Sequence, residues 1–240
     1  MFRRHLTFLK TNFSGEFEPI YKMQSDREDK IKEAVDIIKS GGTVVYPTET
    51  VYGLGADAFS EEAVRKVYKI KGRDFLQPIS IAVSSFEMLH TVAYIDSKSL
   101  EIITELLPGP VTVLLRKKDV VPDVLTATSE VVGVRFPDNE IANHIIKETG
   151  PITATSANVS GRNPPTCIEE VEIKADIIIN GGKCKYSMPS TVVDMSREAA
   201  NEEKAKIKIE IKRRGACYDR VLHVLRGKAA GKGFHGLPVP

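Results

Sequence analysis

The chain has 240 residues, 42% of them hydrophobic, so it is long enough to bury one substantial core and is not disordered as a whole. Its 34 basic and 32 acidic residues leave a formal charge of +2, which excludes a global electrostatic field that would draw nucleic acid or a membrane to the whole surface. The 3 cysteines are widely spaced and form no CxxC pair, which excludes a disulfide framework and a structural zinc site and favours a reducing compartment.

The two ends of the chain are predicted to lie outside the folded domain. The start, MFRRHLTFLK, is interrupted by charges and is unlike a signal peptide, and no apolar run approaches the roughly 20 residues that cross a bilayer, so we expect a cytoplasmic protein without membrane contact. The amphipathic run at 31–42 predicts a helix closed by glycines. The domain is therefore expected over residues 23–217, between an N-terminal extension at 1–22 and a loosely held C-terminal tail at 218–240.

Between these ends, helical patterns alternate with short β-branched runs, which indicates an α/β fold. The run at 206–212 alternates strictly between charged and apolar residues, as an exposed or edge strand does, whereas the run at 176–180 does not. This difference favours a mixed sheet over a purely parallel one. Helices are expected at 60–71, 97–107 and 139–148, and strands at 43–47, 79–83, 111–115, 131–136, 152–156, 176–180, 190–194 and 206–212.

The first unusual segment is YPTETVYGLGADA, residues 46–58, where a strand enters a polar turn rich in hydroxyls and glycine. Thr50 and its neighbours offer donors to a ligand, and Gly53 and Gly55 allow close approach of the backbone. A tight turn whose hydroxyls are satisfied within the turn is the alternative. The segment is not a Walker A loop, because it lacks the GK[ST] ending.

Basic residues stand out at two further places. Lys71 and Arg73 follow a predicted helix in KGRD, where they either favour the helix dipole from a solvated face or clamp a triphosphate. Arg135 lies inside the apolar run VGVRF, where an unpaired guanidinium is costly to bury. Either a structural Asp or Glu or the carboxylate of a ligand is therefore expected to pair with Arg135.

Hydroxyl and amide groups cluster in TATSANVSGRNPPT at 153–166, which contains Ser156, Asn158 and Thr166. A strand that ends in such donors is how α/β folds present a ligand site at the carboxyl edge of a sheet. A polar loop capped by Asn and Ser has the same composition and is the alternative. Two shorter segments are weak signals on their own: PSTVVD, which contains Ser190, and IKRRGA, which contains Arg213.

Taken in order, these segments resemble the YrdC family of L-threonylcarbamoyladenylate synthases over residues 31–216. The hallmark of that family is a lysine-x-arginine with a serine-x-asparagine, here the KGR that begins at Lys71 and the SAN that begins at Ser156. The resemblance implies that residues 23–217 are a catalytic domain of the short, single-domain form. It also implies an α/β fold with a twisted mixed sheet, helices packed on it and an open, positively lined cleft.

The same resemblance implies a role for each of these residues. Lys71 and Arg73 are expected to be the catalytic cations and to hold the phosphates of ATP. The residues expected to bind L-threonine are Thr50, Arg135, Ser156 and Ser190, and the remaining residues expected to bind the nucleotide are Gln77, Asn158, Thr166 and Arg213.

The implied reaction converts L-threonine, bicarbonate and ATP into threonylcarbamoyl-AMP and pyrophosphate, as a nucleotidyltransferase in the threonylcarbamoyladenosine modification of tRNA. Because N-carboxy-threonine attacks the α-phosphorus, the site needs preorganised cations and donors more than a strong base. Mg²⁺ is expected with ATP, held by phosphate oxygens and water and not by dedicated protein ligands. A downstream threonylcarbamoyl transferase and tRNA or double-stranded RNA are the expected macromolecular partners.

Several positions depart from the family pattern. Asp74 stands where a proline is usual and offers a carboxylate to Arg73. Ala82 replaces a common histidine, Val131 a common threonine and Pro189 a glutamate. These departures leave open a non-catalytic protein that binds double-stranded RNA or tRNA on the same fold. A sugar-phosphate enzyme is a weaker alternative, because it needs clustered acidic residues around a catalytic metal.

Overall fold

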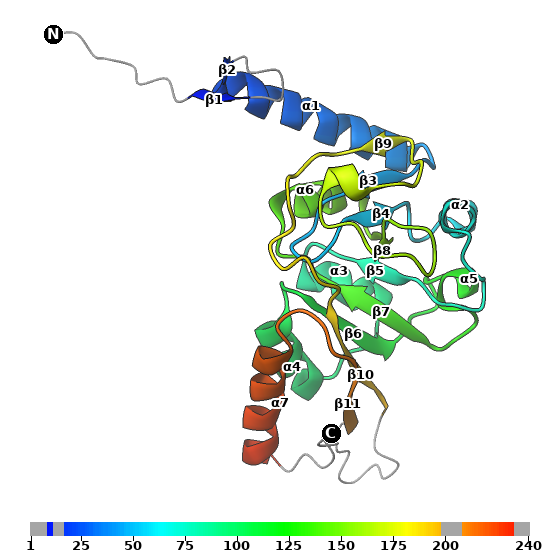
Figure 1. The fold of residues 1–240 in the computed structure, drawn as a ribbon. Helices are drawn as coiled ribbons and strands as arrows, with labels where there is room; N and C mark the ends of the chain where they lie inside the picture. Colours follow the sequence, from blue (N-terminus) through cyan, green and yellow to red (C-terminus); the bar gives the residue numbers. More distant parts are fainter. Residues whose placement is uncertain (1–8, 12–16, 198–207, 233–240) are drawn as a thin grey trace, which may run out of the picture.

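The computed structural model describes residues 9–11, 17–197 and 208–232 (Figure 1). Each helix and strand predicted between residues 31 and 212 is present. The helices are α1 (Ile20–Lys39), α2 (Glu61–Lys71), α3 (Phe86–Val92), α4 (Ser97–Leu106), α5 (Asp123–Thr126), α6 (Glu140–Thr149) and α7 (Tyr218–Lys232), with a 3-10 turn at Ile168–Glu170. The strands are β1 (Leu9–Thr11), β2 (Phe17–Pro19), β3 (Val44–Tyr46), β4 (Gly53–Gly55), β5 (Ser80–Ala82), β6 (Val111–Arg116), β7 (Val131–Arg135), β8 (Ile152–Ser156), β9 (Ile177–Ile178), β10 (Thr191–Arg197) and β11 (Lys208–Arg213).

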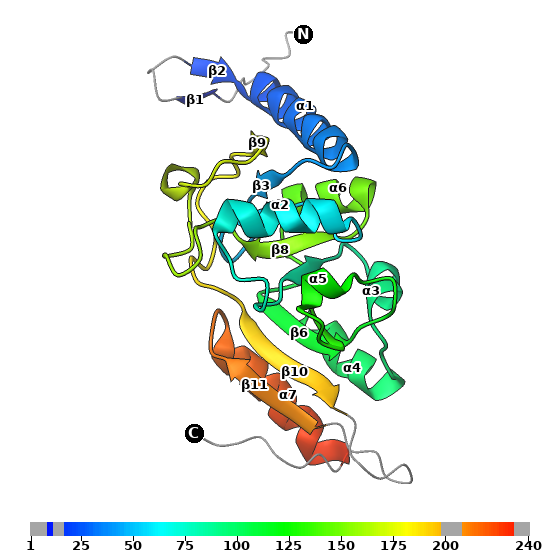
Figure 2. The same ribbon diagram turned by 90° about the vertical axis from the view of Figure 1, so that its right-hand side faces the viewer.

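Nine of these strands form one mixed sheet in the order β11-β10-β6-β7-β5-β8-β4-β3-β9. The pairs β10–β6, β5–β7 and β3–β9 are parallel, and the other pairs are antiparallel. The sheet twists along its length, with α1 near one end and α7 near the other (Figures 1 and 2). The predicted α/β fold with a twisted mixed sheet is therefore confirmed, and β11 is an edge strand, as the alternation at 206–212 indicates.

Strand β4 replaces part of the turn that the sequence predicts at 46–58. It pairs antiparallel with β3, so that Tyr46 lies opposite Gly53. The Tyr46 ring crosses both glycines of the strand: a Cβ at Gly53 or Gly55 would lie 2.8 or 2.9 Å from its carbon atoms. These positions must be glycine because a side chain there would collide with the ring. The prediction of a polar turn did not include this packing constraint.

Local capping residues explain where several helices begin. The side chains of Ser60, Ser85, Asp96 and Asn139 each accept a hydrogen bond from a backbone N–H in the first turn of α2, α3, α4 and α6. At the other end of α2, Gly72 adopts a left-handed conformation with φ 55°. Helices α3 and α5 escape prediction because they have only 7 and 4 residues, too few to establish a helical period.

The two faces of the sheet pack against different helices. One face, which includes Val45, Ile81 and Val134, belongs to the larger core with buried residues of α2, α3, α4 and α7. The opposite face, which includes Val44 and Ala82, packs against α1 and α6 in a smaller core. Because this smaller core covers only one end of its face, the middle of the sheet is left for the cavity described below.

At the N-terminal side, α1 begins at Ile20, inside the segment predicted as an extension at 1–22. Its C-terminal half is anchored to the smaller core through Ile31 and Ile38, which are 4% and 2% exposed. No helix in the described ranges is long and apolar enough to cross a membrane. The parts of the predicted extension at 1–8 and 12–16 lie outside the described residues.

At the C-terminal side, α7 occupies much of the predicted tail at 218–240. Val221 and Leu225 of this helix are 2% and 1% exposed and belong to the larger core, and α7 lies beside α4 (Figure 1). The expectation of a loosely held tail is therefore wrong over α7, because its partner helix lies far away in the sequence. Residues 233–240 lie outside the described residues.

We expect Leu225→Ala to lower the free energy of unfolding by about 2–5 kcal/mol, because the substitution leaves a cavity in the larger core. The matched control is Arg226→Ala on the exposed side of the same helix, which should change this free energy by about 0.5 kcal/mol or less. Chemical denaturation followed by circular dichroism measures both. Equal, small effects of the two substitutions would contradict a structural role for α7.

Candidate functional site

A cavity of about 390 Å³ opens on the face of the sheet that carries the smaller core. Its lining comes from β3, β4, β8, β5, β7, β6, β10 and β11 and from the loops that flank them. Four arginines line it, namely Arg73, Arg135, Arg162 and Arg213, and no carboxylate is found in the lining over the described part of the chain. This composition favours an anionic ligand.

Small residues on neighbouring strands make room for the cavity. Ser80 and Ala82 on β5, Ala154 on β8 and Gly53 on β4 all line it. Gly133 on β7 also leaves room beside β5, because a Cβ at this position would lie only 2.5 Å from Ser80 Oγ. Because side chains alternate along a strand, the larger apolar residues between these positions face the opposite core.

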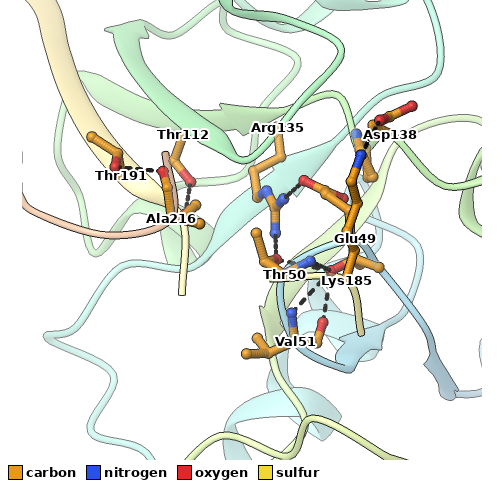
Figure 3. A network of polar contacts seen from close by, with 12 residues as sticks. Glu49, Thr50, Val51, Thr112, Arg135, Asp138, Lys185, Thr191 and Ala216 are labelled. Atoms are coloured by element: carbon orange, nitrogen blue, oxygen red, sulfur yellow. Dashed lines mark hydrogen bonds and ion pairs between the residues drawn. The ribbon is translucent and has the colours of Figure 1, made fainter. Parts of the chain in front are cut away.

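Arg135, at the end of β7, is held by two side chains of the loop between β3 and β4 (Figure 3). Its Nη2 donates to Glu49 Oε1 at 2.5 Å, and its Nη1 donates to Thr50 Oγ1 at 2.8 Å. Glu49 and Thr50 are 2% and 0% exposed, while Arg135 lines the cavity. The sequence left open whether a protein carboxylate or a ligand would pair with this arginine, and the structure identifies Glu49 as its partner.

The Glu49–Arg135 pair is incompletely bonded. Glu49 Oε2 and Arg135 Nε are both buried and have no hydrogen-bond partner. Arg135 also lines the cavity, and one N–H on each of Nη1 and Nη2 remains after the bonds to Thr50 and Glu49. The turn itself is internally bonded, since Thr48 Oγ1 donates to the Val51 carbonyl at 2.7 Å (Figure 3). Both expectations for this segment are partly met, because its hydroxyls bond one another and Thr48 also lines the cavity.

Arg73 follows α2 and reaches the cavity from the loop before β5. Its Nε and Nη2 donate to the backbone carbonyls of Gln77 and Pro78, at 3.1 and 2.9 Å. Asp74 does not pair with it, because Asp74 Oδ1 instead accepts the backbone N–H of Leu76 at 2.9 Å. The charge of Arg73 is thus not neutralised by the neighbouring carboxylate, contrary to the pairing that the sequence suggests.

Arg213, the last residue of β11, forms the opposite wall. Its Nε and Nη2 donate to the Ser190 carbonyl at 3.1 and 2.9 Å, and Nη2 also contacts Ser190 Oγ at 3.1 Å. Ser190 Oγ is in turn 2.7 Å from Thr112 Oγ1 on β6. This chain of contacts connects β11 to β6 through Ser190, the residue before β10. Thr112, at its β6 end, lies apart from the Glu49–Arg135 pair (Figure 3).

The turn that follows β8 carries Ser156 and Asn158 into the lining of the cavity. Asn158 Nδ2 donates to the carbonyls of Val159 and Arg162, both at 2.8 Å, whereas Asn158 Oδ1 is buried without a partner. Lys71 lies behind this turn and is 1% exposed. Its Nζ donates to the Ser156 carbonyl and, at 2.8 Å, to the Asn158 carbonyl.

Burial of the cations disfavours their charged forms. It lowers the pKa of Lys71 to about 8, with a further contribution from the charge of Arg73. Burial also lowers the pKa of Arg73, and burial together with the charge of Arg135 lowers that of Arg213. An anion in the cavity would stabilise the charged forms of these side chains. The cavity is therefore electrostatically suited to phosphate or carboxylate groups.

Six of the ten predicted site residues line the cavity, namely Arg73, Arg135, Ser156, Asn158, Ser190 and Arg213. Thr50 and Lys71 lie just outside it, buried behind Arg135 and behind the turn after β8. The sequence did not predict these buried positions. A local pattern shows that a side chain is polar, but it does not show whether that side chain faces a ligand or another segment of the chain. The roles predicted for these residues stay predictions.

Gln77 and Thr166 are also absent from the lining. The Gln77 carbonyl accepts hydrogen bonds from Arg73 and from the Tyr68 hydroxyl, the latter at 2.9 Å. The backbone N–H and hydroxyl of Thr166 donate to Glu170 Oε2 at 2.6 and 3.0 Å. In this structure both residues therefore shape loops beside the cavity.

Sequence reasoning missed three residues that belong to the site. Glu49 was visible as the acid in PTET, and a buried arginine elsewhere in the chain was the signal that a carboxylate would be needed. Thr112 follows directly after the strand start in PGPVT, and Arg162 lies in the SANVSGR run. Nothing in their local patterns distinguishes them from ordinary strand and loop residues.

No group of three or more His, Cys, Asp or Glu is placed to hold a metal ion within the described ranges. The donors that line the cavity are cations, hydroxyls and an amide, a set that does not suit a resident divalent cation. A metal ion in this cavity would fit only as the companion of a polyphosphate, bound by phosphate oxygens and water.

Comparisons with known proteins agree with this geometry. The Sua5/YciO/YrdC family model, described as "Telomere recombination", matches residues 36–209. The chain is 39% identical to a putative threonylcarbamoyl-AMP synthase of Methanocaldococcus jannaschii, over 72% of this chain and 84% of that protein. It is 41% identical to a threonylcarbamoyl-AMP synthase of Pyrococcus abyssi, over 70% of this chain but only 52% of that protein.

Among solved structures, the fold is similar to Pyrococcus abyssi Sua5 complexed with L-threonine. The TM-score is 0.74 at 36% sequence identity, and the match covers 85% of this chain and 58% of that one. The chain thus spans about half the length of the Pyrococcus abyssi protein and most of the length of the Methanocaldococcus jannaschii one.

We expect Glu49→Ala to lower the free energy of unfolding by about 3–5 kcal/mol, because it leaves the Arg135 guanidinium buried without a counter-ion. Glu172→Ala is the matched control, since it breaks the exposed Arg162–Glu172 pair and should cost about 1 kcal/mol or less. Urea denaturation measures both values. Similar losses for the two substitutions would show that the buried pair contributes no more than a surface pair.

The lowered pKa of Lys71 predicts a pH dependence of stability. Between pH 8, near its pKa in the folded protein, and pH 10.5, its ordinary value, the unfolded chain binds more protons than the folded one. The free energy of unfolding should therefore rise with pH in this window, by up to about 3 kcal/mol from this group. Urea denaturation at several pH values, compared with Lys71→Met, isolates the effect; identical pH slopes in both proteins would contradict it.

Proposed function

Because the chain belongs to the Sua5/YciO/YrdC family, we propose that it is an L-threonylcarbamoyladenylate synthase. The enzyme would form threonylcarbamoyl-AMP and pyrophosphate from L-threonine, bicarbonate and ATP, as a nucleotidyltransferase. The observation that carries the proposal is the cavity, which among the described residues is lined by four arginines and no carboxylate. The related proteins named threonylcarbamoyl-AMP synthase support the same reaction.

The proposed threonine subsite is built around Arg135. Its free N–H groups are available for the amino-acid carboxylate, since Glu49 and Thr50 occupy only part of its donor set. Ser156 and Ser190 would supply hydroxyls from opposite sides of the cavity. The bound L-threonine named for the Pyrococcus abyssi structure supports an amino-acid subsite in this fold.

The proposed nucleotide subsite uses the cations that no carboxylate neutralises. Arg73 and Arg213 form no ion pair within the described part of the chain, and both now donate only to neutral acceptors. Phosphate oxygens would replace or share these acceptors, with Asn158 beside them. Mg²⁺, bound with ATP through phosphate oxygens and water, would neutralise part of the triphosphate charge.

In the proposed reaction, the nitrogen of L-threonine first bonds to the carbon of bicarbonate and water leaves, which gives N-carboxy-threonine. A carboxylate oxygen of this intermediate then bonds to the α-phosphorus of ATP while the bond from the α-phosphorus to the bridging oxygen breaks, and pyrophosphate leaves with that electron pair. Arg73 and Arg213 would stabilise the charge that develops on the phosphates. A cavity recessed in the sheet face would also limit hydrolysis of the mixed anhydride.

The proposal extends to the surroundings of the enzyme. The adenylate would pass to a threonylcarbamoyl transferase that modifies tRNA, in the cytoplasm. The three cysteines are free, which is compatible with a reducing compartment. The alternative of a non-catalytic RNA-binding protein has no specific observation in its favour, and the sugar-phosphate alternative lacks the clustered acidic residues in the cavity lining.

The test is incubation of the protein with labelled ATP, Mg²⁺ and bicarbonate, with and without L-threonine, followed by detection of pyrophosphate and the adenylate. We expect pyrophosphate release that requires both L-threonine and bicarbonate. Arg73→Ala should lower kcat/KM for ATP by about a hundredfold, because a charge-assisted phosphate contact is lost. Arg65→Ala, on the exposed side of α2, is the control. Absence of threonine-dependent turnover in folded protein would refute the proposal.

A further inference from the structure

Lys71 is joined to the turn after β8 at three points. Its ammonium donates to the carbonyls of Ser156 and Asn158, and its own carbonyl accepts the backbone N–H of Ser160 at 2.8 Å. The side chain is 1% exposed and is absent from the lining of the cavity. The end of α2 and this turn therefore form one bonded unit, with the lysine on the side away from a bound ligand.

The same turn presents two side chains to the cavity. Ser156 and Asn158 both line it, although their carbonyl oxygens point to Lys71. A second anchor comes from Tyr52, whose carbonyl accepts the backbone N–H of Ala157 at 2.8 Å. Without the ammonium, the Asn158 carbonyl would lose its side-chain donor, and the Ser156 carbonyl would keep only the backbone N–H of Asn158, at 2.9 Å. The turn would then be freer to rotate these oxygens toward the anions of a ligand, which they repel.

We propose that Lys71 is a positioning residue, which aims the Ser156 hydroxyl and the Asn158 amide into the cavity by binding the two backbone carbonyls of their turn. This proposal rests on the proposed function for the identity of the ligands. It differs from the role predicted from the sequence, in which Lys71 itself binds phosphate. The two roles make opposite predictions about which ligand depends on the lysine.

The burial of Lys71 favours the positioning role. Contact with phosphate would require the ammonium to leave two carbonyl acceptors and to pass the turn that covers it. Arg73, two residues later, already lines the cavity and has no carboxylate partner within the described ranges. The phosphate site therefore already has a cation in the lining of the cavity, whereas within the described residues Lys71 is the cation whose side chain binds the carbonyls of the turn after β8.

The first experiment measures binding of single ligands by isothermal titration calorimetry to wild type, Lys71→Met and the control Lys69→Met. Lys69 is an exposed lysine in the same last turn of α2. We expect Lys71→Met to weaken L-threonine binding by about tenfold or more and to change the affinity for inorganic tripolyphosphate by about twofold or less. A large loss of tripolyphosphate affinity with unchanged threonine affinity would overturn the proposal in favour of a phosphate contact.

Hydrogen exchange tests the positioning role without any ligand. Backbone amides in the turn at 156–160 should exchange about tenfold faster in Lys71→Met than in wild type and Lys69→Met. This result does not depend on the reaction, so failure of wild type to bind L-threonine would count against the proposed function alone. Unchanged exchange in a folded variant would overturn the positioning role.

A second variant covers the case in which Lys71→Met does not fold. Ser160→Pro removes the N–H that binds the Lys71 carbonyl and leaves the lysine charge intact. We expect it to weaken L-threonine binding by about threefold or more and to leave tripolyphosphate binding within about twofold of wild type. Wild-type threonine affinity in folded Ser160→Pro would overturn the idea that this anchoring sets the geometry of the turn.

Discussion

The buried ion pair between Arg135 and Glu49 is the interaction on which the shape of the cavity depends. Arg135 comes from the centre of the sheet and Glu49 from the loop between β3 and β4, so the pair fixes the distance between a strand and a loop that are remote in sequence. The Glu49 carbonyl also accepts the backbone N–H of Tyr186 at 2.8 Å. Three segments thus meet at one residue: removal of its carboxylate would free Arg135, whereas the backbone bond to Tyr186 would remain.

The distribution of charge around this pair is compatible with the two unlike ligands that we propose for the cavity. Arg135 is largely neutralised by Glu49, which suits a zwitterionic amino acid better than a polyanion. Arg73 and Arg213, elsewhere in the lining, donate only to neutral oxygens, which suits a triphosphate. Small residues between these cations keep the sheet face open, so the two ligands can meet above it.

Much of the fold could be predicted from the sequence, because strands and longer helices depend on local patterns. The alternation at 206–212 indicated an edge strand, and the caps at Ser60, Asp96 and Asn139 accompany helices that were predicted. Helix α7 was mistaken for a loose tail because its burial depends on contact with α4, which no local pattern reports. The strand β4 was missed because its glycines match the ring of Tyr46 across a strand pair.

The same distinction applies to the site. Residues whose type is unusual for their surroundings, such as Arg135 in an apolar strand, could be recognised directly. The hydrogen-bond partners of Glu49 and Lys71 could not be predicted, because they depend on what lies opposite these side chains after folding. A short motif identifies a chemical group and its neighbours in sequence, but the direction of its hydrogen bonds is set by the tertiary structure.

The strand order has a consequence for the moment at which the cavity is assembled during translation. Its walls come from β4, near the start of the domain, and from β11, whose Arg213 is synthesised some 160 residues later. β3, β4 and α2 leave the ribosome well before β11, and the wall that contains Arg213 is missing until β11 has joined β10. Among the described strands, the last one to be made therefore completes the site, and a ligand that contacts Arg213 can stabilise the fold only after β11 has been made.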